Sequence, residues 1–201
     1  MKGTSAHADP ARQAISEAGW HTGARRVDSP NFDARPAGEV VSLIVLHAIS
    51  LPPAQFGSGD ILRLFTNRLD AQAHPYFAEI AALRVSAHFL IGRNGELIQL
   101  VACDQRAWHA GVSSFGGRQR CNDFSIGIEL EGCDEQPFAE AQYVQLQALL
   151  VLLRARYPGC SLAGHCHIAP GRKTDPGPLF DWPRLACAEV FLHGISGDPH
   201  Q

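Results

Sequence analysis

The feature that most constrains the fold is a short, almost unbroken aliphatic run, VVSLIVLHAI, at residues 40–49. A bilayer-spanning helix needs about 20 apolar residues, so this run is too short to cross a membrane. Continuous rather than alternating hydrophobicity indicates a strand buried on both faces, as in the centre of an α/β sheet. His47 stands near the end of the run. Strand ends border the binding sites of such sheets, so His47 is a candidate site residue, although a hydrogen-bonded structural histidine is the alternative.

The other segments alternate between strand and helix patterns. Residues 85–101 predict a hairpin that turns at Arg93-Asn94-Gly95, and FSIGIELEG at residues 124–132 predicts another strand. Residues 139–158 predict an amphipathic helix, which Tyr157-Pro158-Gly159 ends. Asp60 is expected to cap a short helix through residues 61–69, and residues 182–194 predict a last short helix. We therefore expect an α/β protein of one domain, with a mixed central β-sheet flanked by helices.

Length and composition narrow the class of protein. The chain has 201 residues, a formal charge of −3 and 45% hydrophobic residues, values typical of one globular domain that binds neither nucleic acid nor membranes. We expect residues 1–18 to be an extension without fixed structure, residues 19–195 to be the domain and residues 196–201 to be a tail. The N-terminal residues lack the apolar core of a signal peptide, which predicts a cytoplasmic protein. The six cysteines are scattered without a C-x-x-C pair, so we expect reduced thiols.

The segment GHCHIAPGRKTDPGP, residues 164–178, holds the densest group of reactive side chains. Its glycines and prolines predict a loop rather than a helix or strand. The simplest interpretation is a solvated surface loop. The alternative is a metal site, because His165 and Asp175 together with His47 offer two imidazoles and a carboxylate, a set that suits Zn²⁺ with one position left open. We exclude Cys166, since neighbours on an extended loop point to opposite sides.

Two further residues would complete a catalytic site around such a metal. Glu129 alternates with the apolar residues of its strand and shares a face with Glu131, and this face meets either solvent or a cleft. In a cleft, Glu129 could accept a proton from water and pass it to a leaving amine. Lys173 could stabilise negative charge on a carbonyl oxygen, or it could be an ordinary surface lysine.

Four segments carry a resemblance to a known family: VLHAISLPPAQFG, HPYFAEIAALRVSAHFLI, RAWHAGVSSFGGRQRCNDFSIGIELEG and GHCHIAPGRKTDPGPLFDW. They resemble the AmpD-type 1,6-anhydro-N-acetylmuramoyl-L-alanine amidases, which belong to the zinc N-acetylmuramoyl-L-alanine amidase family. That family shares its fold with phage T7 lysozyme and the peptidoglycan recognition proteins. The resemblance implies His47, His165 and Asp175 as zinc ligands. It also implies Glu129 and Lys173 as catalytic residues.

The same resemblance implies a substrate and the residues that contact it. The expected reaction is hydrolysis of the amide between the lactyl group of anhydro-muramic acid and L-alanine, in cytoplasmic recycling of peptidoglycan fragments by a monomer. Arg84 and Arg120 match positions at the peptide end of the substrate, where guanidinium groups suit carboxylates. Ala169 is also expected to contact the substrate. Trp108 matches an aromatic residue beside the sugar. A periplasmic amidase acting on intact peptidoglycan and a non-catalytic muropeptide sensor are the alternatives.

Three histidines and one alanine complete the comparison with that family. Ala48 and His167 each stand where relatives commonly carry asparagine, and Ala48 removes an expected hydrogen bond to the sugar. His167 is too close to His165 to replace Asp175, so it is left out of the metal set. His88 and His109 are expected to be structural or to line the cleft.

Overall fold

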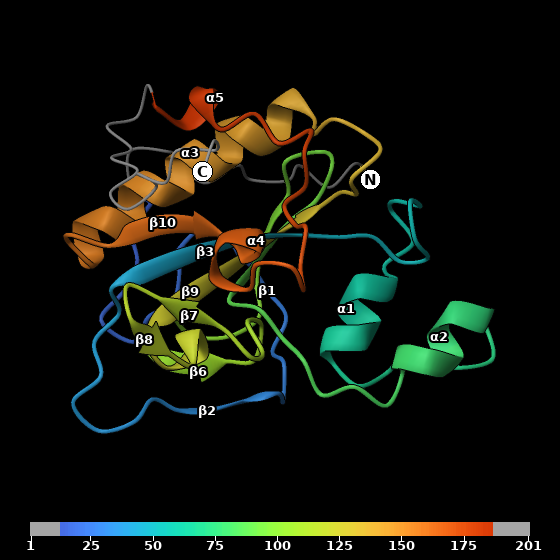
Figure 1. Ribbon diagram of the computed structural model, residues 1–201, viewed down its shortest axis with the longest axis horizontal. Helices are drawn as coiled ribbons and strands as arrows, with labels where there is room; N and C mark the ends of the chain where they lie inside the picture. Colours follow the sequence, from blue (N-terminus) through green and yellow to red (C-terminus); the bar gives the residue numbers. More distant parts are fainter. Residues whose placement is uncertain (1–12, 187–201) are drawn as a thin grey trace, which may run out of the picture.

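The computed structural model describes residues 13–186, and its centre is a mixed six-stranded β-sheet (Figure 1). Strand β5 is antiparallel to β4, and every other neighbouring pair in the sheet is parallel. In spatial order the strands are β1 (Arg25–Arg26), β5 (Leu97–Gln99), β4 (Phe89–Ile91), β9 (Ser125–Glu131), β3 (Leu43–Ile49) and β10 (Ser161–Gly164).

Helices and two small sheets cover this central sheet. Figure 1 shows helix α3 (Glu140–Arg156) and helix α5 (Pro183–Ala186) along one side of it. On the other side lie the pair β2 (Phe32–Ala34) and β6 (Gln105–Ala107), and the pair β7 (Ser114–Phe115) and β8 (Arg118–Gln119). The remaining helices are α1 (Asp60–Phe65), α2 (Pro75–Ile80), the short 3₁₀ helix η2 (Cys121–Asp123) and α4 (His165–Ile168). The expected α/β domain with a mixed sheet and flanking helices is confirmed.

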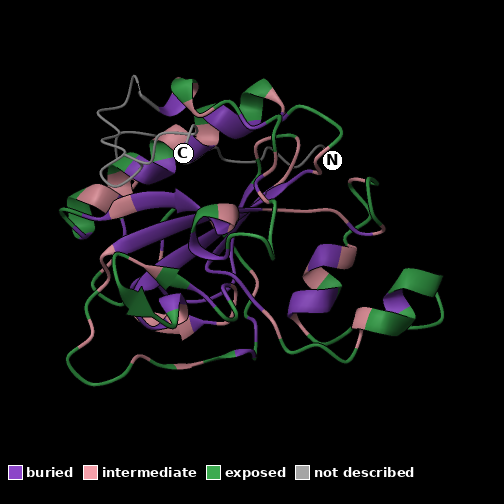
Figure 2. Cartoon of the chain, in the orientation of Figure 1, coloured by how far each residue is buried: buried purple, intermediate pink, exposed green. Residues whose placement is uncertain are grey.

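Strands β3 and β9 are buried along most of their length (Figure 2), and the two faces of β3 pack against different parts of the core. Ile44 and Leu46 of β3 share a hydrophobic cluster with Leu146 and Leu149 of α3, whereas Leu43 and Val45 belong to a second cluster. Full burial of such a side chain contributes about 1.5–3 kcal/mol, so the central strands are held firmly from both sides. His47 follows the odd-numbered face, which is the face turned away from α3.

The β9 strand settles the question left open for its two glutamates. Ile126, Ile128 and Leu130 pack in the cluster with α3, as the alternation predicts. The opposite face is not solvated, because every residue of β9 is buried, including Glu129 and Glu131. The Glu131 carboxylate accepts hydrogen bonds from the backbone amides of Gly57 and Arg93. The two carboxylates are therefore enclosed by the fold rather than exposed on its surface.

Two local expectations were wrong. Asp60 does not cap α1: the N-cap is Gly59, whose φ of 78° only glycine adopts at little cost, and the Asp60 carboxylate pairs with Arg63 instead. The segment 164–178 is not irregular throughout, because it begins with the single helical turn α4. The Ala169 carbonyl then accepts the amide of Lys173, so the loop folds back on itself at once.

Other local expectations are confirmed. The β4–β5 hairpin turns at residues 93–95, where Gly95 has a φ of 81° and a Cβ would lie 2.9 Å from the Ala141 carbonyl oxygen. Helix α3 buries the expected stripe and is capped at its C-terminal end by Tyr157. Helix α5 matches the start of the last expected helix, the rest of which lies outside the described residues together with Cys187 and the expected tail. The cysteines that the structure describes are free thiols.

The expected N-terminal extension is described only from residue 13 onward. Within it, Ile15 is buried in the cluster with α3 and forms a bridge with His21. Between residues 13 and 186, no helix combines the length and the hydrophobicity that crossing a membrane requires.

Candidate active site

The site is built at the ends of neighbouring parallel strands. His47 on β3 and Glu129 on β9 are register partners, so they lie side by side on the same face of the sheet. Both are buried, with relative exposures of 2% and 8%. Next to β3 on its other side, β10 ends at Gly164, whose register partner is Leu46. The first residue after β10 is His165, which therefore lies beside His47.

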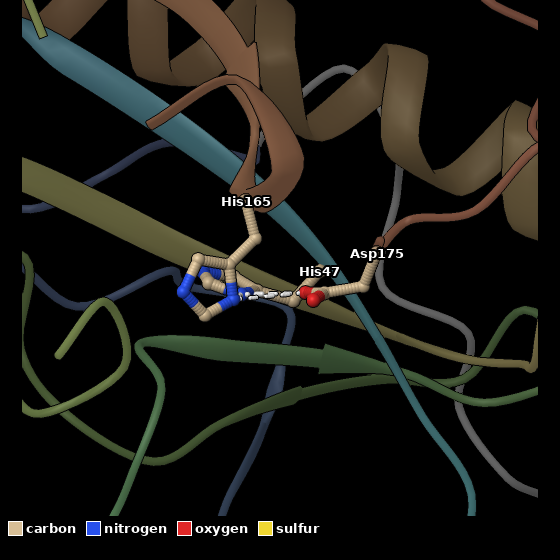
Figure 3. A group of neighbouring side chains, drawn as sticks. All are labelled: His47, His165 and Asp175. Atoms are coloured by element: carbon tan, nitrogen blue, oxygen red, sulfur yellow. Dashed lines mark hydrogen bonds and ion pairs between the residues drawn. The ribbon is translucent and has the colours of Figure 1, made fainter. Parts of the chain in front are cut away.

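The loop after β10 brings Asp175 back to the two histidines. The backbone amide of Cys166 donates a 2.9 Å hydrogen bond to the carbonyl of Asp175, which ties the two ends of the segment together. As Figure 3 shows, the three side chains then point at one another. His47 Nδ1 lies 3.0 Å from His165 Nδ1 and 3.1 Å from Asp175 Oδ2, and the latter two atoms are 3.0 Å apart.

These three atoms fit a divalent metal ion. His165 Nε2 lies 3.1 Å from the Ala110 carbonyl oxygen, which can only accept, so Nε2 carries the hydrogen and the Nδ1 lone pair faces the Asp175 carboxylate. Two electron-pair donors at 3.0 Å repel each other unless a cation lies between them. Two imidazoles with one carboxylate are a common set for catalytic Zn²⁺.

Glu129 is held in an environment that suits proton transfer. Burial, and then the nearby Asp175 carboxylate, raise its pKa well above the ordinary value, whereas the Lys173 charge lowers it. Its Oε2 atom is buried without a hydrogen-bond partner among the described residues. A carboxyl group with a raised pKa and a free oxygen is what a general acid and base requires.

A single cleft of about 590 Å³ contains these residues. His47, Glu129, His165, Asp175 and the exposed Lys173 line its polar side. The remaining wall is largely apolar and aromatic, and it includes Tyr76, Ile80, Leu83, Val85 and Trp108. Ala48 also lines the cleft, next to His47. The cleft can therefore hold a ligand with an apolar or sugar-like surface directly beside the metal donors.

The other expected substrate contacts are distributed around this cleft. Trp108 lines it, and its indole Nε1 donates a hydrogen bond to Asp33. Arg120 and Ala169 line a neighbouring hollow of about 530 Å³, which also holds Arg172. Arg84 lies between the cleft residues Leu83 and Val85, but its guanidinium is exposed and donates to the carbonyls of Ala82 and Leu83. Trp108 thus joins the metal cluster in one cleft, whereas the peptide contacts stay predictions.

Three further residues lie near the metal cluster without belonging to its three donors. His167 accepts a hydrogen bond from the Gly164 amide at Nδ1, packs against the Trp182 ring and is outside the group of three converging donor atoms. Cys166 is outside the cluster as well. His109 lines the cleft, as expected, but its contact with His47 at 2.9 Å had no signal in the sequence, because a loop residue's partner depends on the whole fold.

Comparison with known proteins agrees with this geometry. The family model described as N-acetylmuramoyl-L-alanine amidase matches residues 37–178. The 1,6-anhydro-N-acetylmuramyl-L-alanine amidase AmpD of Escherichia coli K12 is 60% identical over 173 residues, which is 85% of this chain and 94% of that protein. A crystal structure of a selenomethionine AmpD derivative is 59% identical and covers 86% of this chain and 97% of its own, with a TM-score of 0.84.

A more distant solved structure is a substrate complex. It contains the E. coli amidase AmiD with the substrate anhydro-N-acetylmuramic acid-L-Ala-D-γ-Glu-L-Lys, and it is 31% identical, covering 88% of this chain and 65% of its own, with a TM-score of 0.55. The sheet with its three converging donors, the family match and these relatives lead to one conclusion. The chain belongs to the N-acetylmuramoyl-L-alanine amidase family.

Proposed function

We propose that this enzyme is a zinc-dependent amidase that cleaves the bond between the lactyl group of 1,6-anhydro-N-acetylmuramic acid and the L-alanine of a stem peptide. The observation that carries the proposal is the convergence of His47 Nδ1, His165 Nδ1 and Asp175 Oδ2 within about 3 Å of one another, in the cleft that Glu129 and Lys173 also line.

The chain's own residues divide the chemistry between them. Zn²⁺, when bound, supplies a Lewis acid that polarises the amide carbonyl and lowers the pKa of water toward neutrality. Glu129 takes a proton from the attacking water and delivers it to the departing alanine nitrogen, a role that its raised pKa and unpartnered Oε2 support. Lys173 supplies positive charge beside the carbonyl oxygen on which negative charge develops.

The substrate is assigned from the relatives and from the lining of the cleft. The E. coli relative is named for the anhydro-muramyl linkage, and the AmiD complex contains an anhydro-muramyl peptide. In this chain the apolar wall with Trp108 would receive the sugar. Arg84 and Arg120 would meet the peptide, and Ala169 would also contact the substrate. Arg120 has a left-handed backbone, φ 60°, a strained conformation that is often found at binding sites.

Three finer features complete the proposal and stay predictions. Ala48 lies in the cleft beside His47 without a polar side chain, so discrimination at the sugar end should be looser than in a relative with asparagine there. The amidase acts as a monomer. It works in the cytoplasm, on peptidoglycan fragments that are being recycled.

The test combines metal analysis with product identification. Purified protein should contain about one zinc per chain and should release anhydro-N-acetylmuramic acid and free stem peptide from a defined anhydro-muropeptide, detected by mass spectrometry. Binding of the anhydro-muropeptide without cleavage by the zinc-loaded protein would instead indicate a sensor. Faster turnover of polymeric peptidoglycan than of the anhydro-muropeptide would indicate an amidase of intact cell wall.

A further inference from the structure

A chain of side-chain contacts starts at the nitrogen of His47 that faces away from the metal donors. His47 Nε2 lies 2.9 Å from His109 Nδ1. His109 Nε2 lies 3.2 Å from Ser125 Oγ, which in turn lies 2.6 Å from the Cys121 carbonyl oxygen. His47 and Ser125 are buried, whereas His109 is half-buried and lines the cleft.

The last link fixes the direction of every hydrogen bond before it. The Cys121 carbonyl can only accept, so the Ser125 hydroxyl donates to it and keeps its lone pairs for His109 Nε2–H. A neutral imidazole with its hydrogen on Nε2 has its acceptor at Nδ1. His109 Nδ1 therefore accepts from His47 Nε2–H. The Nδ1 lone pair of His47 is left facing His165 and Asp175.

Ala110, the residue after His109, orients the ring of His165, the second histidine of the metal cluster. The Ala110 carbonyl accepts from His165 Nε2–H at 3.1 Å, which leaves the Nδ1 lone pair of His165 facing the same point. The backbone amides of His109 and Ala110 both donate to Asn122 Oδ1, at 3.1 and 2.8 Å. One anchored dipeptide thus sets the orientation of both imidazoles.

The fold also makes room for the His109 ring. The ring packs against Gly127 of β9, where a Cβ atom would lie 2.5 Å from His109 Cγ and 2.6 Å from Nδ1. No real side chain tolerates such a contact, so only glycine at this position lets the ring reach His47. The absence of a side chain at Gly127 therefore provides the space that the His109 ring occupies.

We propose that His109 is a positioning residue for the metal site, with Ser125 as its support: it accepts the Nε2–H of His47 and thereby holds the Nδ1 lone pair of His47 toward the metal. This inference rests on the proposed zinc site. Loss of such an outer partner typically weakens metal binding about 10- to 100-fold.

The test is the zinc dissociation constant, measured by competition with a chelator of known affinity. His109→Leu removes the acceptor and should weaken zinc binding by about 10- to 100-fold. His109→Asn is smaller, but its amide oxygen is bonded to Cγ as Nδ1 is and can take the place of that acceptor, so it should recover most of the affinity. Ser125→Ala should fall between wild type and His109→Leu. The matched control is Ser29→Ala, which removes another buried hydroxyl that donates to a backbone carbonyl but has no hydrogen bond to His47, His109 or His165, and it should leave zinc affinity unchanged.

The outcomes separate this inference from the proposed function. A wild-type protein without zinc affinity would overturn both. Wild-type zinc binding with equal losses in the Asn and Leu variants would overturn only the positioning role, because packing alone would then explain the loss. If His109→Leu does not fold, wild-type affinity in Ser125→Ala would overturn the positioning role in the same way. Nitrogen NMR of zinc-loaded protein should show His47 and His109 protonated at Nε2, and protonation of His109 at Nδ1 would contradict the proposal.

Discussion

His47 and Glu129 are register partners on the parallel strands β3 and β9. The ladder between these strands sets the separation of the proposed metal donor His47 and the proposed proton carrier Glu129, and both strands are largely buried. Neither side chain depends on a mobile loop for its place. The relative positions of His47 and Glu129 are therefore fixed by the sheet. The positions of His165, Asp175 and Lys173 depend instead on the folding of one loop.

Replacing Glu129 or Lys173 should separate chemistry from metal binding. Neither contributes a donor atom to the metal cluster, so Glu129→Gln and Lys173→Met should keep about one zinc per chain. Each should lower kcat by about a hundredfold or more, the usual effect of removing a positioned proton carrier or an oxyanion partner. Zinc per chain and single-turnover cleavage of an anhydro-muropeptide are the measurements. Wild-type cleavage by Lys173→Met with zinc in place would mean that the lysine is not catalytic.

His165→Ala and Asp175→Ala are the complementary variants. Each removes one of the three converging donor atoms, so each should lose zinc and, with it, activity. The zinc content after dialysis against metal-free buffer measures this. Stoichiometric zinc in either variant would show that the ion is held elsewhere.

Removal of zinc should abolish activity without unfolding the protein. The hydrophobic clusters on the two faces of the sheet do not include the metal donors, so the core does not need the ion, in contrast to a zinc finger. Far-ultraviolet circular dichroism should be retained after chelation, and the midpoint of thermal unfolding should fall, because zinc binds only the folded state. Loss of the dichroism signal on mild chelation would contradict this.

One guanidinium group connects the two ends of the proposed substrate site. Arg106 pairs with Asp33, which accepts the Trp108 indole, and with Asp123, which pairs with Arg120. Arg106→Met should therefore disorder both Trp108 and Arg120 and should raise KM several-fold while changing kcat less. Steady-state kinetics measure the split. Arg25→Met, which breaks the exposed Arg25–Glu96 pair, is the control and should leave KM unchanged.

The same network predicts a pH effect on stability. A hydrogen bond from Arg106 is the largest cause that lowers the pKa of Asp33. A lowered folded-state pKa means that Asp33 stabilises the protein above its unfolded pKa of about 3.9, and that this stabilisation is lost as pH falls through the folded-state pKa. The free energy of unfolding of Asp33→Asn should thus differ more from wild type at pH 6 than at pH 3, as urea titrations can show. An equal difference at both pH values would contradict the ion pair.

Much of this molecule could be predicted from the sequence, and the failures have a common cause. The aliphatic run through Leu43–Ile49 and the stripe of α3 are local patterns whose burial follows from hydrophobicity alone. The face of Glu129 could not be assigned, because whether it meets solvent or a cleft depends on which segments cover the sheet. The prediction that Asp60 caps α1 was wrong for a related reason: the N-cap of α1 is Gly59, which has a left-handed backbone. The contact of His109 with His47 depends on a loop whose partner lies far away in the chain.

Adding a single methyl group to β9 should reach the metal site through His109. In Gly127→Ala the new Cβ would lie 2.5 Å from His109 Cγ, so the ring must move away from His47. We expect zinc affinity to fall about tenfold or more. The free energy of unfolding should fall by about 1–3 kcal/mol, the usual cost of overpacking a core.

Adding His109→Ala removes the clash, so the loss of folding stability in the double variant should be smaller than the sum of the two single losses. Gly95→Ala is the control: it strains a turn with a φ of 81° remote from the cleft, so it should lower stability without changing zinc affinity. Chelator competition and urea unfolding of the zinc-free protein measure the two quantities, and additive losses of stability in the double variant would show that Gly127 and His109 do not act on one another.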